Sequence, residues 1–224
     1  MLNMVKRILI LLLLLCNLPV WAAVDSVHTE RFSRLAQQLN IRQSKLKQGE
    51  YQVRVWEKVA LAYGDAQKLY VIDKKRKNVK LMKYTMSWNK QIFKGFTRSK
   101  PKQQPDEPFW QEMVQLDLLT LPDKDQIREK IFPKQKPRDY SSRVKVNSDS
   151  TVVVTAQKAQ GSHLIMGDGV GYIVEVLGKD YFHTYSYSNP LSYAKARPEV
   201  DELQKIAVIL FKIKGVFGDD PLRY

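Results

Sequence analysis

Alternating apolar and polar residues predict a series of β-strands in this 224-residue chain. At residues 51–56, the apolar Tyr51, Val53 and Val55 alternate with polar neighbours, which is the period of a half-buried strand. At residues 79–88, Met82, Tyr84, Met86 and Trp88 share one face and Lys83 lies on the other, and we interpret that stripe as core. Further strands are predicted at residues 69–72, 144–146, 151–155, 172–177 and 181–187.

Apolar residues at helical spacing predict helices near the beginning, the middle and the end of the chain. Residues 28–41 form the first, with Thr29 as its cap and an apolar face of Phe32, Leu35, Ala36 and Leu39. Others are expected at 109–119, at 122–131, and at 199–214 with an inner side of Leu203, Ile206, Leu210 and Ile213. Residues 97–108 and 133–142 contain prolines and few apolar side chains, which predicts loops.

Together these elements favour an α+β fold, with a mostly antiparallel sheet packed on N-terminal, central and C-terminal helices. Short turns connect most of the predicted strands, as in an antiparallel sheet, and the helices fall outside the strand runs. We see no internal repeat. We expect residues 23–224 to form a single domain, since about 200 residues suffice for one good core.

The first 22 residues have the pattern of a cleavable secretory signal. Two cations, Lys6 and Arg7, precede the apolar residues 8–15, and Val20-Trp21-Ala22 ends the segment with small side chains at its first and third places. The apolar stretch is too short to span a membrane, which takes about 20 residues. We therefore expect cleavage near Ala22/Ala23 and a periplasmic or secreted protein. The alternatives are an uncleaved anchor, and a lipoprotein modified at Cys16, which the bulky Leu15 disfavours.

The net charge of the chain indicates more about possible partners than its overall composition does. Without Lys6 and Arg7 the mature chain has 35 basic and 23 acidic side chains, a net charge of 35 − 23 = +12. The single cysteine leaves with the signal, so we expect no disulfide, thiolate nucleophile or cysteine-bound metal in the mature protein. The apolar content of 44% indicates a folded chain.

Cations concentrate between residues 68 and 102, where twelve basic residues accompany one acid, Asp73. Aromatic side chains are interspersed among them. A cationic surface can attract an anionic partner, and it can also protect the edge of a sheet from aggregation. We favour an acidic protein as the partner over anionic lipid or glycan, and both over nucleic acid. The residues expected to bind it are Lys74, Lys75, Arg76, Lys77, Lys80 and Lys83, with Lys90 and Lys94 extending the surface.

One pair of side chains could support proton transfer. If residues 178–180 form a three-residue hairpin loop, Glu175 and His183 face each other across two strands, with Tyr185 beside them. A carboxylate next to an imidazole can position it as a general base. The same arrangement is also ordinary on the surface of a sheet. Because no G-x-S-x-G motif supplies a nucleophile, we favour the structural interpretation.

Metal and cofactor binding have little support in the sequence. His28, His163 and His183 are widely spaced, and we expect no metal ligands among them. Asp123 and Asp125 resemble the start of a calcium loop, but Ile127 occupies the place of the third oxygen ligand, so we expect them to cap a helix. The glycine-rich residues 167–171 are followed by a strand, which predicts a turn instead of a phosphate cradle. We expect no cofactor.

Residues 168–217 resemble a loose group of exported bacterial proteins of unknown function. The similarity lies in Asp168-Gly169, a strand with Glu175, Tyr181, the return strand ending in Ser188-Asn189-Pro190, and a closing helix. Where this chain has Tyr172, the group carries Trp. The resemblance implies a strand, a hairpin return and a helix, and it implies no activity.

We therefore expect an exported binding protein without enzymatic activity. Its partner would be an acidic protein, and one specific form is an immunity protein that occludes an incoming toxin. An envelope enzyme using Glu175 and His183 is the first alternative. A peripheral envelope protein held on anionic lipid or glycan by its basic hairpin is the second.

Overall fold

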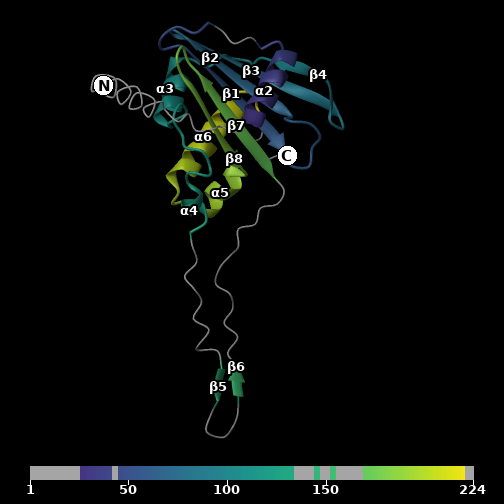
Figure 1. Cartoon of the computed structure of the whole chain (residues 1–224). Coiled ribbons are helices and arrows are strands. Elements are labelled where there is room, and N and C mark those ends of the chain that lie inside the picture. Colours follow the sequence, from purple (N-terminus) through teal and green to yellow (C-terminus); the bar gives the residue numbers. More distant parts are fainter. Residues whose placement is uncertain (1–25, 42–44, 134–143, 147–151, 155–168, 220–224) are drawn as a thin grey trace, which may run out of the picture. The chain divides into compact units, whose positions relative to one another are not determined.

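The structure is a computed structural model that describes residues 26–41, 45–133, 144–146, 152–154 and 169–219 (Figure 1). The predicted signal, Cys16, His163 and residues 167–168 of the glycine-rich stretch lie outside these ranges. The chain divides into two compact units, residues 1–43 and residues 44–224. Within the described residues, no helix is both long enough and apolar enough to cross a membrane.

The first unit contributes one described helix, α2 (Ser26–Gln38). Its apolar face was predicted correctly, because Phe32, Leu35, Ala36 and Leu39 are all buried. The helix begins at Ser26, so the prediction that Thr29 caps it was wrong; Thr29 lies inside the first turn.

The second unit is built on a six-stranded antiparallel sheet, as the α+β prediction requires. The strand order is β4-β3-β2-β1-β7-β8, so that β1 pairs on one side with β2 and on the other with β7. The strands are β1 (Tyr51–Val59), β2 (Lys68–Lys75), β3 (Asn78–Asn89), β4 (Ile92–Ser99), β7 (Val170–Leu177) and β8 (Phe182–Ser188). A separate short hairpin pairs β5 (Val144–Val146) with β6 (Val152–Val154).

Strand β4 falls partly in the predicted loop at 97–108, and that prediction was wrong for residues 97–99. Its sequence is atypical for a strand, because Lys94 and Arg98 are exposed and Gly95 has φ +149° opposite a register shift in β3. Such charges and irregularities are common in edge strands, where they prevent pairing with another chain. The propensity signal of β4 is therefore weak although the strand is paired.

Four described helices belong to the second unit: α3 (Glu107–Gln115), α4 (Arg128–Ile131), α5 (Pro190–Ala196) and α6 (Asp201–Gly215). Asp106 caps α3 by accepting a hydrogen bond from the amide of Phe109, and Pro108 lies in the first turn, where its missing N–H costs nothing. The central helix is thus shorter than predicted, and only the last turn of the predicted 122–131 helix is α-helical.

The core of this unit lies between one face of the sheet and the helices, as Figure 1 shows for α3, α5 and α6. The four residues predicted for the inner side of the last helix are among the most buried in the protein. Alternate residues of each strand face the core, and residues paired across neighbouring strands face the same side. Examples on the core face are Val53 with its partner Ile72, and Val55 with its partner Val174. Every functional candidate can therefore be assigned to the core face or to the opposite face.

Candidate functional site

The proposed pair of Glu175 and His183 is not formed. The loop between β7 and β8 has four residues, so His183 lies opposite Val176, and Glu175 lies opposite Thr184. Shifting the register by one residue moves a side chain to the other face of a sheet. His183 therefore lies on the core face with Tyr185, and Glu175 lies on the other. The expected juxtaposition was wrong because it assumed a loop one residue shorter.

Glu175 instead belongs to a buried polar cluster with β1. Its Oε2 accepts a hydrogen bond from Trp56 Nε1 at 2.9 Å and lies 3.7 Å from a guanidinium nitrogen of Arg54. The chain of contacts continues from Arg54 to Gln52 and from Gln52 to Asp73. Burial raises the pKa of Glu175, while Trp56 and Arg54 oppose that rise. These partners satisfy the carboxylate within the fold, which is a structural role.

His183, two tyrosines of β8 and Tyr181, which directly precedes that strand, also have a structural role. Their side chains all reach backbone carbonyls of the segment after α3: Tyr181 to Leu119 at 2.5 Å, His183 to Leu121 at 2.8 Å, Tyr185 to Leu118 and Tyr187 to Pro122 at 2.7 Å each. We call these four side chains the carbonyl ladder. Burial raises the pKa of the Tyr185 hydroxyl well above its ordinary value, so Tyr185 is held as a donor. A carbonyl oxygen only accepts, so His183 Nε2 carries the proton in this contact.

Asp123 completes this connection, although not as a helix cap. One carboxylate oxygen accepts hydrogen bonds from the amide and the hydroxyl of Ser186 on β8, at 2.7 and 2.9 Å, and the other accepts from the amide of Asp125. Among the residues that the structure describes, no group of three or more His, Cys, Asp or Glu side chains is arranged to hold a metal ion.

Two of the six predicted partner-binding cations are withdrawn into the fold. Lys74 is buried and lies 2.8 Å from Glu107 at the start of α3. Lys83 lies on the core face, 2.8 Å from Asp219 beyond α6 and over the ring of Phe217. Lys74 and Lys83 are therefore not part of an exposed cationic surface, contrary to the prediction from the sequence. Their counter-charges come from distant parts of the sequence, which a local count of acids cannot include.

Asp219 gathers a small network at the end of α6. It accepts hydrogen bonds from Lys83 and from Tyr70, and Lys68 lies 3.9 Å away. Burial alone would raise the pKa of Asp219, but the hydrogen bonds from Lys83 and Tyr70 outweigh burial, so the pKa is lowered. This network holds the chain after α6 against the sheet and gives Lys83 and Lys68, two cations of the basic run, one shared counter-charge.

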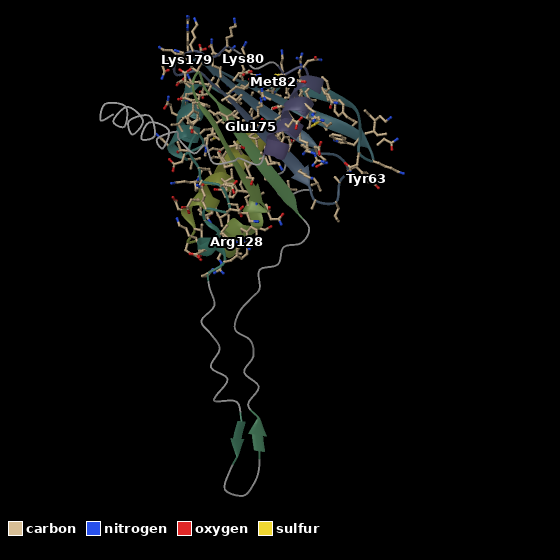
Figure 2. The ribbon with its side chains drawn as sticks, in the orientation of Figure 1. Tyr63, Lys80, Met82, Arg128, Glu175 and Lys179 are labelled. Atoms are coloured by element: carbon tan, nitrogen blue, oxygen red, sulfur yellow. The ribbon has the colours of Figure 1, made fainter. Side chains whose placement is uncertain are left out.

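The other four predicted cations remain on the surface and lie close together. Lys75, Arg76, Lys77 and Lys80 are exposed at the two-residue turn between β2 and β3, and we call them the cationic tip. Arg76 has φ +52°, so the turn is tight and its side chains extend outward. Figure 2 labels Lys80 at this end of the sheet.

The sheet register brings the exposed ion pair of Lys179 and Asp180, which sequence reasoning missed, to this end of the sheet without adding net charge, and it removes two predicted cations. Gln52 pairs with Leu177, and Tyr51 pairs with Lys74, so the β7–β8 turn with exposed Lys179 lies at the same end of the sheet as the cationic tip. Lys90 and Lys94 lie at the other end of β3, roughly 35 Å away at about 3.3 Å per residue. The predicted extension of the surface to these two residues was wrong.

An open hollow lies at the edge of the sheet near β8. Lys58 and Lys124 line this hollow of about 390 Å³ together with Ser188 and Asn189. Gly169 is also part of its wall, and a side chain there would collide with Asn189. Two cations and two polar side chains suit a small carboxylate or phosphate better than a neutral ligand.

The chain matches no protein-family model, and no curated protein or solved structure is significantly similar to it. The strand, the hairpin return and the closing helix expected from the resemblance are nevertheless formed, as β7, β8 and α6. The carbonyl ladder gives the tyrosine-rich part of that pattern a structural purpose.

Proposed function

We propose that this chain is an exported binding protein without enzymatic activity, and that its cationic tip contacts an acidic protein. The observation that carries the proposal is that Lys75, Arg76, Lys77 and Lys80 are all exposed within six residues of one another around a single turn. Like charges gathered at one turn repel one another, which costs stability and leaves an outward positive field. An acidic partner relieves that repulsion.

The polar clusters support a binding role over the enzymatic alternative. Glu175 and His183 lie on opposite faces of the sheet, and each is already hydrogen-bonded to a group of the fold. A general base must be within hydrogen-bond reach of its substrate. A protein that neutralises a toxin needs a rigid surface and a charged contact, and this unit offers both.

Site-specific cross-linking tests the proposed contact surface. A photo-reactive amino acid replaces Lys77, and a matched control replaces Lys90 at the opposite end of the sheet. In the native-type host, we expect a discrete acidic protein to cross-link at Lys77 and not at Lys90. Equal products at both positions would show non-specific attraction and contradict the proposal.

The identified partner then allows a kinetic test. Lys75→Glu with Lys77→Glu should lower the association rate by about tenfold at low salt, because steering by charge acts mainly on association. Lys90→Glu with Lys94→Glu is the control and should change the rate less than twofold. Salt should reduce the difference, since exposed charges are screened over about 8 Å at physiological ionic strength. An association rate that does not change at low salt would contradict the proposal and indicate that the cationic tip only protects the sheet from aggregation.

Export is part of the same proposal and has a direct test. Mass spectrometry of the protein from a native-type host should find an N-terminus at Ala23 or within a few residues of it. An intact Met1 would support an uncleaved anchor, and a lipid on Cys16 would support a lipoprotein; either result would overturn the soluble exported form.

A further inference from the structure

Three large apolar side chains are exposed at the end of the sheet opposite to the cationic tip. Leu61 and Tyr63, in the loop between β1 and β2, are 80% and 59% exposed, and Ile92, at the turn between β3 and β4, is 62% exposed. We call Leu61, Tyr63 and Ile92 the apolar tip. Figure 2 labels Tyr63, away from Lys80 along the strands.

Two aromatic rings join the loops that carry these side chains. Trp88 on β3 packs edge-on against Phe93 on β4, with ring centroids 5.4 Å apart, and Phe93 directly follows Ile92. The β1–β2 loop lies on the indole of Trp88, because a Cβ at Gly64 would be 2.1 Å from that ring. Gly64 also has φ +87°, so only glycine fits this contact without strain. The two loops are therefore neighbours.

Hydrogen bonds fix the loop between β1 and β2 in its exposed form. The side chain of Gln67 accepts from the amide of Val59 at 2.6 Å and donates to the carbonyl of Tyr63 at 2.7 Å. The indole of Trp88 donates to the carbonyl of Ala66 at 2.7 Å. A loop that is ordered before binding loses less entropy when it binds. The fold thus keeps Leu61 and Tyr63 in water although nearby apolar surface exists.

The chain segments that carry the apolar tip also carry exposed lysines. The segments 58–67 and 88–95 contain Lys58, Lys90 and Lys94 and one acid, Asp65, a local charge of 3 − 1 = +2. All three lysines are exposed. Exposed apolar side chains with flanking lysines are the combination by which peripheral proteins bind anionic membranes, since the apolar groups enter the interface and the cations attract acidic headgroups.

We propose that the apolar tip docks this protein onto the surface of a bilayer that contains anionic phospholipid. The shape favours a bilayer over a protein, because a stable protein interface buries about 800 Å² on each partner, and three side chains on two narrow turns supply much less. Lipid needs no complementary surface, and each apolar side chain that enters the interface contributes in proportion to its buried area. Docking at this end would direct the cationic tip away from the bilayer.

Vesicle sedimentation tests the proposal, with vesicles of phosphatidylcholine alone and with 30 mol% phosphatidylglycerol. The full chain should partition onto the anionic vesicles and much less onto the neutral ones. Leu61→Ser with Ile92→Ser should lower the partition coefficient at least tenfold. The matched control is Val208→Ser with Phe211→Ser on α6, since those side chains are 40% and 43% exposed and lie outside the apolar tip. We expect the control to change partitioning less than twofold.

Charge variants separate this proposal from the proposed function. Lys90→Gln with Lys94→Gln should lower binding to anionic vesicles several-fold, and Lys75→Gln with Lys77→Gln should leave it within twofold. Equal binding by the Leu61/Ile92 variant and the parent would overturn membrane docking, as would equal losses in the α6 control. If Lys75→Gln with Lys77→Gln causes the largest loss of vesicle binding, the cationic tip is the lipid-binding surface. That result would overturn the apolar-tip proposal and also the proposal that the cationic tip contacts a protein. Circular dichroism confirms that each variant is folded.

Discussion

The buried ion pair between β1 and α6 allows a quantitative prediction about stability. Lys214 and Glu57 are 1% and 4% exposed, and Lys214 Nζ lies 3.1 Å from Glu57 Oε2. The ammonium also contacts the hydroxyl of Tyr172 at 3.3 Å. On the other oxygen of Glu57, Lys68 lies 3.4 Å away, with a side chain that is 29% exposed. The pair therefore holds the last helix to the sheet, and Lys68 is a second, weaker counter-charge for Glu57.

Replacing Lys214 with Met should destabilise the protein by about 2–4 kcal/mol. Removing one partner of a buried pair costs about 3–5 kcal/mol because it leaves a buried charge without compensation. Lys68 remains near Glu57 and reduces that loss. For a domain of this size, each kcal/mol corresponds to about 2–4 °C in Tm. A further change, Glu57→Leu in the Lys214→Met background, should recover most of the stability, since an apolar pair avoids the desolvation of both charges.

Urea denaturation followed by circular dichroism measures these differences. Lys212→Met is the matched control, because Lys212 is on the same helix and its ion pair with Glu112 is largely exposed. Exposed pairs contribute about 0–1 kcal/mol, so this variant should remain near the parent. A loss below about 1 kcal/mol for Lys214→Met, or an equal loss for both variants, would refute the reasoning.

Three further predictions concern the fold around the candidate sites, each measured as the free energy of unfolding. Gly64→Ala should cost at least about 2 kcal/mol, because the backbone conformation is unfavourable to alanine and the new methyl group would collide with the indole of Trp88. The control Gly49→Ala has φ +74° but open space around it, so it should cost about 1 kcal/mol. Similar losses for the two variants would refute the collision. Tyr185→Phe should cost about 1–3 kcal/mol because a buried carbonyl loses its donor, whereas the partly exposed Tyr181→Phe should cost little; equal losses would contradict this. Because the folded pKa of Glu175 is raised, the contribution of Glu175 to stability is fully present below its unfolded pKa of about 4.3 and is lost as pH rises through the folded pKa; Glu175→Gln should remove this loss from the pH profile, and an unchanged slope would exclude Glu175 as its source.

The sequence predicted the elements of the fold well where side-chain period and burial agree. The inner residues of α6 and the buried Val53 and Val55 of β1 were predicted correctly. The core stripe predicted on β3 was wrong in its face, because Val79 and Leu81 supply the core of this unit. On the opposite face Tyr84 and Met86 are buried, and Met82 and Trp88 are partly buried. Helix α5 was missed, since it has only seven residues, beginning with Pro190, which are too few for a periodic signal. The strand order was not predictable, because pairing of β1 with β7 connects parts of the chain more than a hundred residues apart.

The candidate sites were less predictable than the fold because they depend on register and on distant partners. A loop one residue longer than assumed was enough to place Glu175 and His183 on opposite faces. The cationic tip was found as a local run of charge, but Asp219, which neutralises Lys83, is 136 residues away in the sequence. The apolar tip has no sequence signal of its own, since exposed and buried leucines look alike until the fold is known.

The carbonyl ladder has a consequence for how the two sides of that contact can change during evolution. Every residue has a backbone carbonyl, so Leu118, Leu119 and Leu121 can be exchanged without removing the acceptors that β8 uses. The donors on β8 are particular side chains of particular length, and replacing Tyr185 or Tyr187 removes the bond itself. Because Leu118 and Leu121 are also core residues, we expect homologous chains to retain the aromatic strand while the segment that it holds exchanges one apolar side chain for another, so that relatives are better recognised from their tyrosines than from the residues those tyrosines bind.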